Sequence, residues 1–384
     1  MLNFTYYNPV KIVFGKGTIA QLPTLLPAEA RVLMTYGGGS IQRNGVYDQV
    51  TAALEGRSLS EFGGIEPNPR YETLLRAIEQ CRREGIDFLL SVGGGSVLDG
   101  TKFIAAALRY DGDDPWTMMT ERIAVPEAVP IGCVLTLPAT GSEMNGNFVI
   151  SRESTGQKLG CWSAAVHPRF SILDPETTYS LPPRQTANGV VDTFIHVVEQ
   201  YMTYDVNAPL QDRQAEAILL TLIEEGPKAL ADPRDYDARA NLMWCATNGL
   251  NSLIGRGVPG DWAAHMIGHE LTALYGIDHG QSLAVVWPCV ARHQRRQKRA
   301  KLLQYAERVW GVTGGEEEAR IDEALRRTAE FFRSLGVGTR LSDYGIPAEA
   351  GAVVAARIAE HGMVLGEHKA IGETEVAEIL ALAV

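Results

Sequence analysis

The sequence is poor in several features that would point to particular classes of protein. Its five cysteines are scattered, odd in number and free of any CxxC spacing, which argues against a disulfide framework and a zinc knot. No apolar run approaches the roughly 18–20 residues that a membrane-spanning helix needs. The first residues lack the charged start and apolar core of a signal peptide. We therefore expect a cytoplasmic protein with reduced thiols.

Basic residues are also in the minority. The chain of 384 residues has 35 Lys and Arg against 46 Asp and Glu, a formal net charge of −11. Nucleic acids and anionic membranes attract basic surfaces, so neither is expected as the main partner. Apolar residues make up 45% of the chain and charged residues 21%, which is typical of a folded globular protein and excludes disorder. At roughly 150 residues per domain, the length predicts two domains.

The first half of the chain has the pattern of a parallel sheet. Up to about residue 180, short β-rich apolar runs alternate with helical patterns. The expected strands are 11–14, 31–36, 88–92 and 131–137, with helices expected over 71–84 and 97–108. Runs that are apolar on both faces suit a sheet covered by helices, so residues 1–180 are predicted to form a doubly wound α/β domain.

The second half has no strand pattern after the prolines at 182 and 183. Apolar residues recur at spacings of three and four, which predicts helices over 187–201, 211–225, 238–253, 262–274, 298–309 and 321–335. We therefore expect residues 181–384 to form an all-helical domain. Two such domains usually leave a cleft between them, and ligands favour such places.

Three turns rich in glycine or serine follow predicted strands and open predicted helices. They span Gly37–Ser40, Gly93–Ser96 and Ala139–Glu143. In such a turn the backbone N–H groups can approach an anion closely, and the following helix adds favourable dipole charge. One turn of this kind is more often a plain tight turn, but three in one domain favour a nucleotide. Neither the GxGxxG fingerprint nor a P-loop motif occurs at these turns.

The first of these turns bears on the choice between NAD and NADP. NAD-selective sites place a carboxylate near the end of an early strand, where it binds the ribose 2′-hydroxyl. Residues 36–40 contain no carboxylate, and Arg43 follows closely. A 2′-phosphate would be accepted by the glycine turn, the Ser40 hydroxyl and a nearby cation, so we expect NADP(H). The alternative is that these residues simply end a strand.

Only eight histidines are present, yet four of them fall at two places in the helical half. Asp192 and His196, four apart in an apolar segment, would share one buried face of a helix. His265 and His269 repeat this spacing, and His279 follows just beyond the expected helix. Each pair alone could be a local hydrogen bond or a core histidine. Together, one carboxylate and three imidazoles suit zinc or ferrous iron, with one histidine to spare.

Taken together, these motifs resemble those of the iron-containing (group III) alcohol dehydrogenase family over nearly the whole chain. The residues that carry the resemblance are Phe14–Gly17, Tyr36–Ser40, Gly63–Pro69, Gly93–Lys102, Leu135–Glu143, Leu173–Pro175, Gly189–His196, Trp262–Glu270 and Asp278–Gly280. The branch most resembled is that of the NADPH-dependent aldehyde reductases and butanol dehydrogenases. The resemblance implies a Rossmann-like dinucleotide-binding domain followed by an all-α metal-binding domain, an architecture shared with dehydroquinate synthase.

The resemblance also implies roles for single residues. The metal ligands would be Asp192, His196, His265 and His279, and His269 would lie near the nicotinamide and substrate. The implied cofactor residues are Gly38, Gly39 and Ser40 for the 2′-phosphate, Gly94, Gly95 and Ser96 for the pyrophosphate, Asp99 and Lys102 in the GGGSxxDxxK pattern, Thr136, Thr140 and Ser142 along the cofactor, and Lys158 near the nicotinamide ribose.

One segment departs from the family pattern. Met144, Asn145 and Asn147 are more crowded and more polar than the small residues that the resemblance leads us to expect there. Since this stretch should face the substrate, the resemblance carries no substrate preference over to this chain.

The expected reaction is hydride transfer between NADP(H) and small aldehydes or primary alcohols. The ion, Fe²⁺ or Zn²⁺, would act as a Lewis acid, and His269 would pass the final proton. Members of the family commonly form homodimers. One alternative is a metal-dependent lyase of the dehydroquinate synthase kind, which would need several Lys and Arg near the ligands. Another is a non-catalytic cofactor-binding protein, against which a complete ligand set argues.

Overall fold

The computed structural model describes residues 1–384, which divide into two compact units. The sheet unit contains residues 7–181 and 233–247, and the helical unit contains residues 1–6, 182–232 and 248–384. The domain division at residue 180 stays a prediction. The contacts of the chain group residues 1–6 with the helices and residues 233–247 with the sheet.

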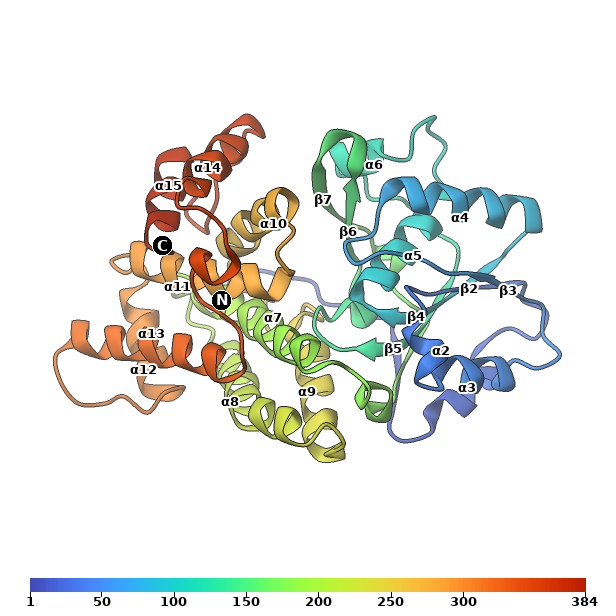
Figure 1. The fold of residues 1–384 in the computed structure, drawn as a ribbon, viewed down its shortest axis with the longest axis horizontal. Helices are drawn as coiled ribbons and strands as arrows, with labels where there is room; N and C mark the ends of the chain where they lie inside the picture. Colours follow the sequence, from blue (N-terminus) through green and yellow to red (C-terminus); the bar gives the residue numbers. More distant parts are fainter. The chain divides into compact units, whose positions relative to one another are not determined.

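A six-stranded parallel sheet forms the centre of the sheet unit, with the strand order β1-β8-β5-β4-β2-β3. Figure 1 labels β2, β3, β4 and β5 of this sheet. The strands are β1 Lys11–Phe14, β2 Val32–Thr35, β3 Leu59–Phe62, β4 Phe88–Gly94, β5 Ile131–Leu137 and β8 Phe170–Leu173. The four predicted strands are confirmed. The edge strand β3 was not predicted, because its sequence, LSEF, is half polar.

Side chains of the central strands alternate between two buried clusters, one on each face of the sheet. Leu89 packs in the cluster that contains residues of α4 (Tyr71–Glu84) and α5 (Gly95–Ala107). Leu90 packs in the cluster that contains residues of α1 (Leu22–Leu25) and α3 (Val46–Ala53). Burial on both faces explains the continuous apolar runs, and it confirms the predicted doubly wound α/β fold.

An antiparallel hairpin of β6 (Asn147–Arg152) and β7 (Gln157–Trp162) follows the third glycine turn. That turn was expected to open a helix, and this expectation is wrong. Only three residues of 3₁₀ helix, Ser142–Met144, follow it. The first turn opens a helix of four residues, α2 (Ser40–Arg43), and only the second turn opens a long helix, α5.

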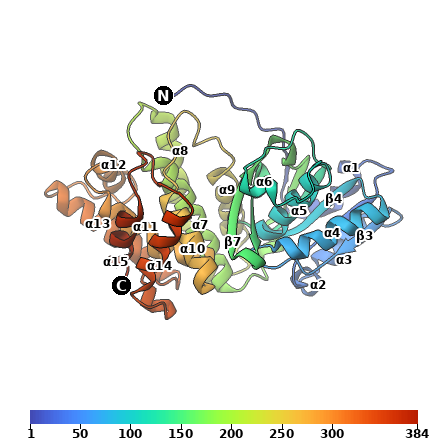
Figure 2. The same cartoon turned by 90° about the horizontal axis from the view of Figure 1, so that it is seen from above.

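The helical unit is organised around α7 (Pro183–Tyr201), in which every residue from Gly189 to Tyr201 is buried. This helix packs against α8 and α11, and α10 packs against α11 (Figure 2). The other helices of this unit are α8 Pro209–Ala231, α10 Ala263–Tyr275, α11 His279–His293, α12 Arg299–Arg308, α13 Glu317–Ser334, α14 Ala350–Glu360 and α15 Glu373–Ala381. Helix α9, Tyr236–Gly249, belongs almost entirely to the sheet unit. None of the helices combines the length and apolar character that crossing a bilayer requires.

All six helices predicted in this half are present. Three further helices, α11, α14 and α15, were not predicted, and α11 is the one that matters for the site because it begins at His279. Pro288 interrupts its helical pattern in the sequence but lies inside the helix.

Candidate metal centre and nucleotide-binding edge

Asp192 and His196 lie one turn apart on α7. Each is 5% exposed, and the Asp192 Oδ1 atom lies 3.4 Å from the His196 Nδ1 atom. The helix begins at two prolines, which are tolerated there because the first N–H groups of a helix have no intrahelical partner. Its burial on all sides then brings a carboxylate and an imidazole into the interior of the unit.

His265 lies in the first turn of α10, which two carboxylates cap. Asp261 Oδ1 accepts a hydrogen bond from the Ala263 N–H at 3.0 Å, and Glu199 Oε1 accepts one from the Ala264 N–H at 2.7 Å. Carboxylates are favourable at this end of a helix, since they satisfy N–H groups and complement its dipole. The first turn of α10, with His265 in it, is thereby fixed against α7.

His279 is the first residue of α11, and contacts with α7 hold that end of the helix. Asp278 accepts a hydrogen bond from Asn188 at 2.8 Å and pairs with Arg184 at 3.1 Å. A Cβ atom on Gly280 would lie 2.6 Å from the Asn188 carbonyl oxygen, so only glycine allows this approach. The close contact of Gly280 with the backbone of α7 thus holds His279 next to that helix.

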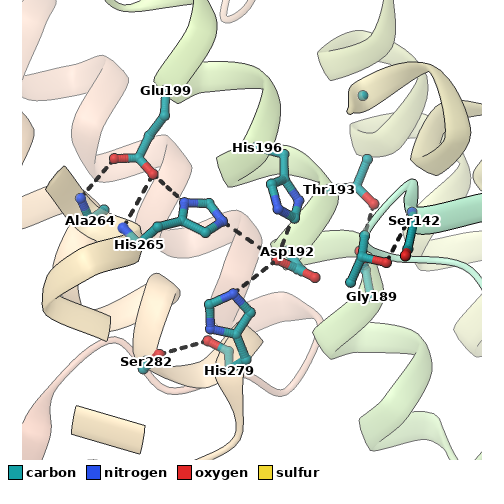
Figure 3. Close-up of polar contacts among 12 residues, drawn as sticks. Ser142, Gly189, Asp192, Thr193, His196, Glu199, Ala264, His265, His279 and Ser282 are labelled. Carbon is teal, nitrogen blue, oxygen red and sulfur yellow. Dashed lines mark hydrogen bonds and ion pairs between the residues drawn. The ribbon is translucent and has the colours of Figure 1, made fainter. Parts of the chain in front are cut away.

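Three imidazoles converge on one oxygen of Asp192 (Figure 3). From Asp192 Oδ1 the distances are 3.4 Å to His196 Nδ1, 3.9 Å to His265 Nε2 and 3.7 Å to His279 Nε2. Most of these are longer than hydrogen bonds. Ligands on a tetrahedral ion with bonds of about 2.1 Å stand about 3.4 Å apart, which is close to the observed spacing.

These residues fit a divalent ion. Ligand atoms of Asp192, His265 and His279 all lie within 4.8 Å of one another, and the His196 ring centroid is 4.5 Å from that of His265. Burial, and then the charge of His265, holds the pKa of His196 well below its usual value. A neutral imidazole is the form that binds a metal. Three nitrogens and one carboxylate oxygen suit zinc or ferrous iron.

His269 stands beside this group without joining it. Its ring centroid lies 5.1 Å from that of His279 and 6.4 Å from that of His265. Unlike His265, it is partly exposed. The ring of His269 is thus as close to His279 as that of His265, which lies 5.3 Å away, but His269 is outside the group of ligand atoms that Asp192, His265 and His279 form.

Glu199 is a part of the site that was not predicted from the sequence. It lies one turn beyond His196 on α7, is 2% exposed, and contacts His265 Nδ1 through Oε2. Burial raises its pKa and the charge of Asp261 adds to this, whereas N–H donors from Ala264 and His265 oppose it. The available signal was its position seven residues after Asp192, which puts a third polar residue on the same helix face.

The predicted cofactor residues of the glycine turns lie at the carboxyl edge of the parallel sheet. Gly38, Gly39 and Ser40 follow β2, Gly94 ends β4, and Gly95 and Ser96 open α5. Thr136 is the last residue but one of β5, and Thr140 and Ser142 follow that strand. The strand order changes direction between β2 and β4, and such a switch point is where open α/β sheets bind ligands.

Asp99 and Lys102 lie beneath this edge and hold the 142–149 segment. The fully buried Lys102 ammonium group donates hydrogen bonds to oxygens of Ser142, Asn145 and Asn147 at 2.7–3.2 Å. Asp99 accepts from the Ser142 hydroxyl at 2.7 Å and from the Val149 N–H at 3.0 Å. Burial lowers the pKa of Lys102 to about 8. Both side chains thus hold the loop that follows β5, and their contact with the cofactor stays a prediction.

Lys158 extends from β7. Its ammonium group donates a hydrogen bond to Asn68 Oδ1 at 2.8 Å. Asn68 in turn donates its backbone N–H to the Ser96 hydroxyl at 3.4 Å, which links Lys158 to the second glycine turn. Burial raises the pKa of Asp99, and the charge of Lys102 and, less strongly, that of Lys158 oppose this.

The comparisons with known proteins agree with this architecture. The profile of the iron-containing alcohol dehydrogenases matches residues 9–175, and that of the C-terminal part of the Fe-containing alcohol dehydrogenase family matches residues 186–384. The chain belongs to the iron-containing alcohol dehydrogenase family. It is therefore an enzyme of the oxidoreductase class.

Relatives in this family align over almost their whole length. The chain is 58% identical to the NADPH-dependent aldehyde reductase YqhD of Escherichia coli, with 96% of each chain covered. It is 42% identical to the probable NADH-dependent butanol dehydrogenase 1 of Bacillus subtilis, with 99% of each covered. The crystal structure of YqhD from E. coli K-12 superposes with a TM-score of 0.98 at 55% identity, over 100% of this chain and 99% of the other. The comparisons give no support to the lyase alternative.

This family member differs from expectation at Asn145. The segment 144–147 was expected to face the substrate, but the Asn145 side chain is 1% exposed and points inward. It donates a hydrogen bond to the Gly141 carbonyl at 2.9 Å and accepts one from Lys102 at 3.2 Å. For Asn145 the expectation is wrong, because its amide serves the fold of the loop.

Proposed function

We propose that this protein is an NADPH-dependent aldehyde reductase that converts small aldehydes to primary alcohols and catalyses the reverse reaction. The observation that carries the proposal is the convergence of Asp192 with the imidazoles of His196, His265 and His279. The similarity to the E. coli enzyme named as an NADPH-dependent aldehyde reductase supports the same activity.

The metal centre is proposed to hold one Fe²⁺ or Zn²⁺ ion through these four residues. A bound ion would supply Lewis-acid polarisation of a carbonyl oxygen. The four ligand residues contribute only one negative charge, so an ion that they hold would keep positive charge to stabilise oxygen atoms that gain negative charge. The family name supports iron, while the ligand set suits zinc equally well.

His269 is proposed to pass the proton that completes the alcohol. It is partly exposed, which allows exchange with water, and its ring lies 5.1 Å from that of His279. An imidazole is suited to the task, since it gains and loses a proton near neutral pH. No side chain is needed as a nucleophile, because hydride comes from the nicotinamide.

NADP(H) is proposed as the nucleotide because of the residues after β2. Ser40 is exposed there, Arg43 lies in the same short helix, and neither Gly38 nor Gly39 carries a side chain that would repel a phosphate. The pyrophosphate is assigned to Gly94, Gly95 and Ser96, where the first N–H groups of α5 have no intrahelical partner. A Cβ atom on Gly95 would lie 2.6 Å from the Thr140 hydroxyl oxygen, so the glycine lets the second and third turns approach closely.

We further propose a homodimer in the cytoplasm. The first strand, β1, is an edge strand of the sheet, which leaves one side available for pairing with a second copy. All five cysteines are free thiols and buried, as in proteins of a reducing compartment.

An oxidation assay tests the proposed function. NADPH and NADH are each mixed with aldehydes of increasing chain length, butyraldehyde included, and the metal content of the same preparation is measured. We expect aldehyde-dependent oxidation and a Michaelis constant for NADPH about tenfold or more below that for NADH, since a charge-assisted contact to the 2′-phosphate is lost with NADH. A preference for NADH would contradict the nucleotide assignment, and no oxidation with any aldehyde would contradict the reductase itself.

A further inference from the structure

Glu199 makes contacts with both ends of a strained turn. Its carbonyl oxygen accepts a hydrogen bond from the Asp261 N–H at 2.9 Å, while its carboxylate accepts from the N–H groups of Ala264 at 2.7 Å and His265 at 3.3 Å. Between them, Trp262 has a φ of +61°, a left-handed conformation that is rare for a large side chain. Such strain persists only where surrounding contacts fix it, and it clusters at functional sites.

The same carboxylate contacts the ring of His265. Its Oε2 atom is hydrogen-bonded to His265 Nδ1, and the other ring nitrogen, Nε2, faces Asp192 Oδ1 at 3.9 Å (Figure 3). Two backbone N–H groups already donate to Glu199, so the carboxylate acts as an acceptor there. The proton of the neutral imidazole therefore lies on Nδ1, which leaves the lone pair of Nε2 directed toward Asp192.

We propose that Glu199 is a positioning residue that fixes the orientation and tautomer of His265 for metal binding. The inference rests on the proposed function, because it requires that His265 is a ligand. Carboxylates that accept the second N–H of a metal-binding histidine raise its basicity and fix its ring, and their loss typically weakens metal affinity 10- to 100-fold. One side chain thus caps α10 and selects the tautomer of the ligand in its first turn.

Glu199→Gln separates this role from packing, since it keeps the shape of the side chain. The carboxylate accepts from three N–H groups, whereas an amide has a single acceptor oxygen. In the variant an NH₂ group must face either the α10 backbone or His265 Nδ1. The second arrangement would move the imidazole proton to Nε2, where it blocks metal binding.

The test is Zn²⁺ affinity of the full-length apoprotein, measured by competition with a chromophoric chelator. We expect Glu199→Gln to bind Zn²⁺ about 10- to 100-fold more weakly than the wild type. Glu270→Gln is the matched control, since Glu270 is a buried glutamate on α10, the helix of His265, and pairs with Arg357 at 2.7 Å. It should change the unfolding midpoint while its Zn²⁺ affinity stays within threefold of the wild type.

A double-mutant cycle with His265→Ala shows whether Glu199 acts through His265. If it does, Glu199→Gln should cause little further loss of Zn²⁺ affinity in the His265→Ala background. Additive losses would overturn the assignment, as would wild-type affinity in Glu199→Gln. Absence of Zn²⁺ binding by the wild type would instead contradict the proposed metal site itself.

A spectroscopic measurement on the wild type covers the case in which Glu199→Gln does not fold. In protein labelled with ¹⁵N-histidine, the long-range ¹H–¹⁵N pattern identifies which ring nitrogen of each histidine carries the proton. We expect His265 to be protonated on Nδ1 in the apoprotein and in the Zn²⁺-bound protein, with the resonances assigned from His265→Ala. A proton on Nε2 in the apoprotein would contradict the proposal.

Discussion

Asp192 holds the central position among single residues, because its Oδ1 atom lies within 3.9 Å of nitrogens from three histidines. The spacing of Asp192 and His196 predicted a shared helix face, and the structure has it. Glu199 was not predicted, because a glutamate that follows an apolar run is also typical of a solvent-exposed helix end. Only the length of α7 and its burial to Tyr201 show that Glu199 lies inside.

At the scale of single residues, the proposed proton transfer by His269 can be tested. Replacing it with alanine should leave the metal content unchanged, because it is not one of the four expected ligands and lies outside the group that Asp192, His265 and His279 form. Turnover should fall about 100-fold or more, the usual effect of removing a general acid or base. The measurement is kcat across the pH range, with metal analysis of the same sample.

His293→Ala serves as the control for this variant, since His293 contacts Glu378 at 2.8 Å in another part of the helical unit. It should keep wild-type turnover. Full activity of His269→Ala at every pH would show that another group or water passes the proton.

At the scale of elements, a network of buried ion pairs supports the first turn of α10. Lys298 donates to Asp261 at 2.8 Å and to Glu367 at 2.7 Å, and the ion-paired side chains are each 4% exposed. Asp261 in turn caps α10. The segment that precedes α15 is thereby fixed to the first turn of α10, the helix that carries His265.

This network makes stability depend on pH. Burial raises the pKa of Glu367 to about 7, and its hydrogen bond with Asp261 adds to the shift, while Lys298 opposes it. In the unfolded chain the pKa of a glutamate is about 4.3. Between these values the folded protein binds more protons than the unfolded chain, so the contribution of Glu367 to stability falls as pH rises from about 4.5 to 7.

Glu367→Gln should remove this dependence. Relative to the variant, the wild type should lose about 2 kcal/mol of its free energy of unfolding between pH 4.5 and 7. Urea titrations at several pH values measure it, with Glu360→Gln at an exposed position as the control. Parallel curves for wild type and Glu367→Gln would show that Glu367 titrates normally.

Among the elements, those with an uninterrupted pattern were predictable. The buried strands β2, β4 and β5 and the long helix α7 fall where apolar spacing put them. Helix α11 was missed because Pro288 ordinarily ends a helix, and the hairpin of β6 and β7 was missed because its strands mix polar and apolar residues. The third glycine turn resembled the second in sequence, yet Lys102 and Asn145 hold it as a loop.

At the scale of the whole molecule, the expected metal ligands and the expected nucleotide-binding residues lie in different units. All four expected metal ligands lie in the helical unit, and all expected nucleotide contacts lie in the sheet unit. The order of an α/β half followed by a helical half was predictable from the change of pattern near residue 180. The return of residues 233–247 to the sheet unit was not, since a buried helix does not reveal in its sequence which partner it packs against.

Anomalous diffraction from crystals of the metal-loaded protein can show whether the four expected ligands share one ion. We expect one peak per chain, about 2.0–2.2 Å from the Asp192 carboxylate and from ring nitrogens of His196, His265 and His279. An active protein whose only ion lies elsewhere, or in which these four side chains share no ion, would contradict this expectation.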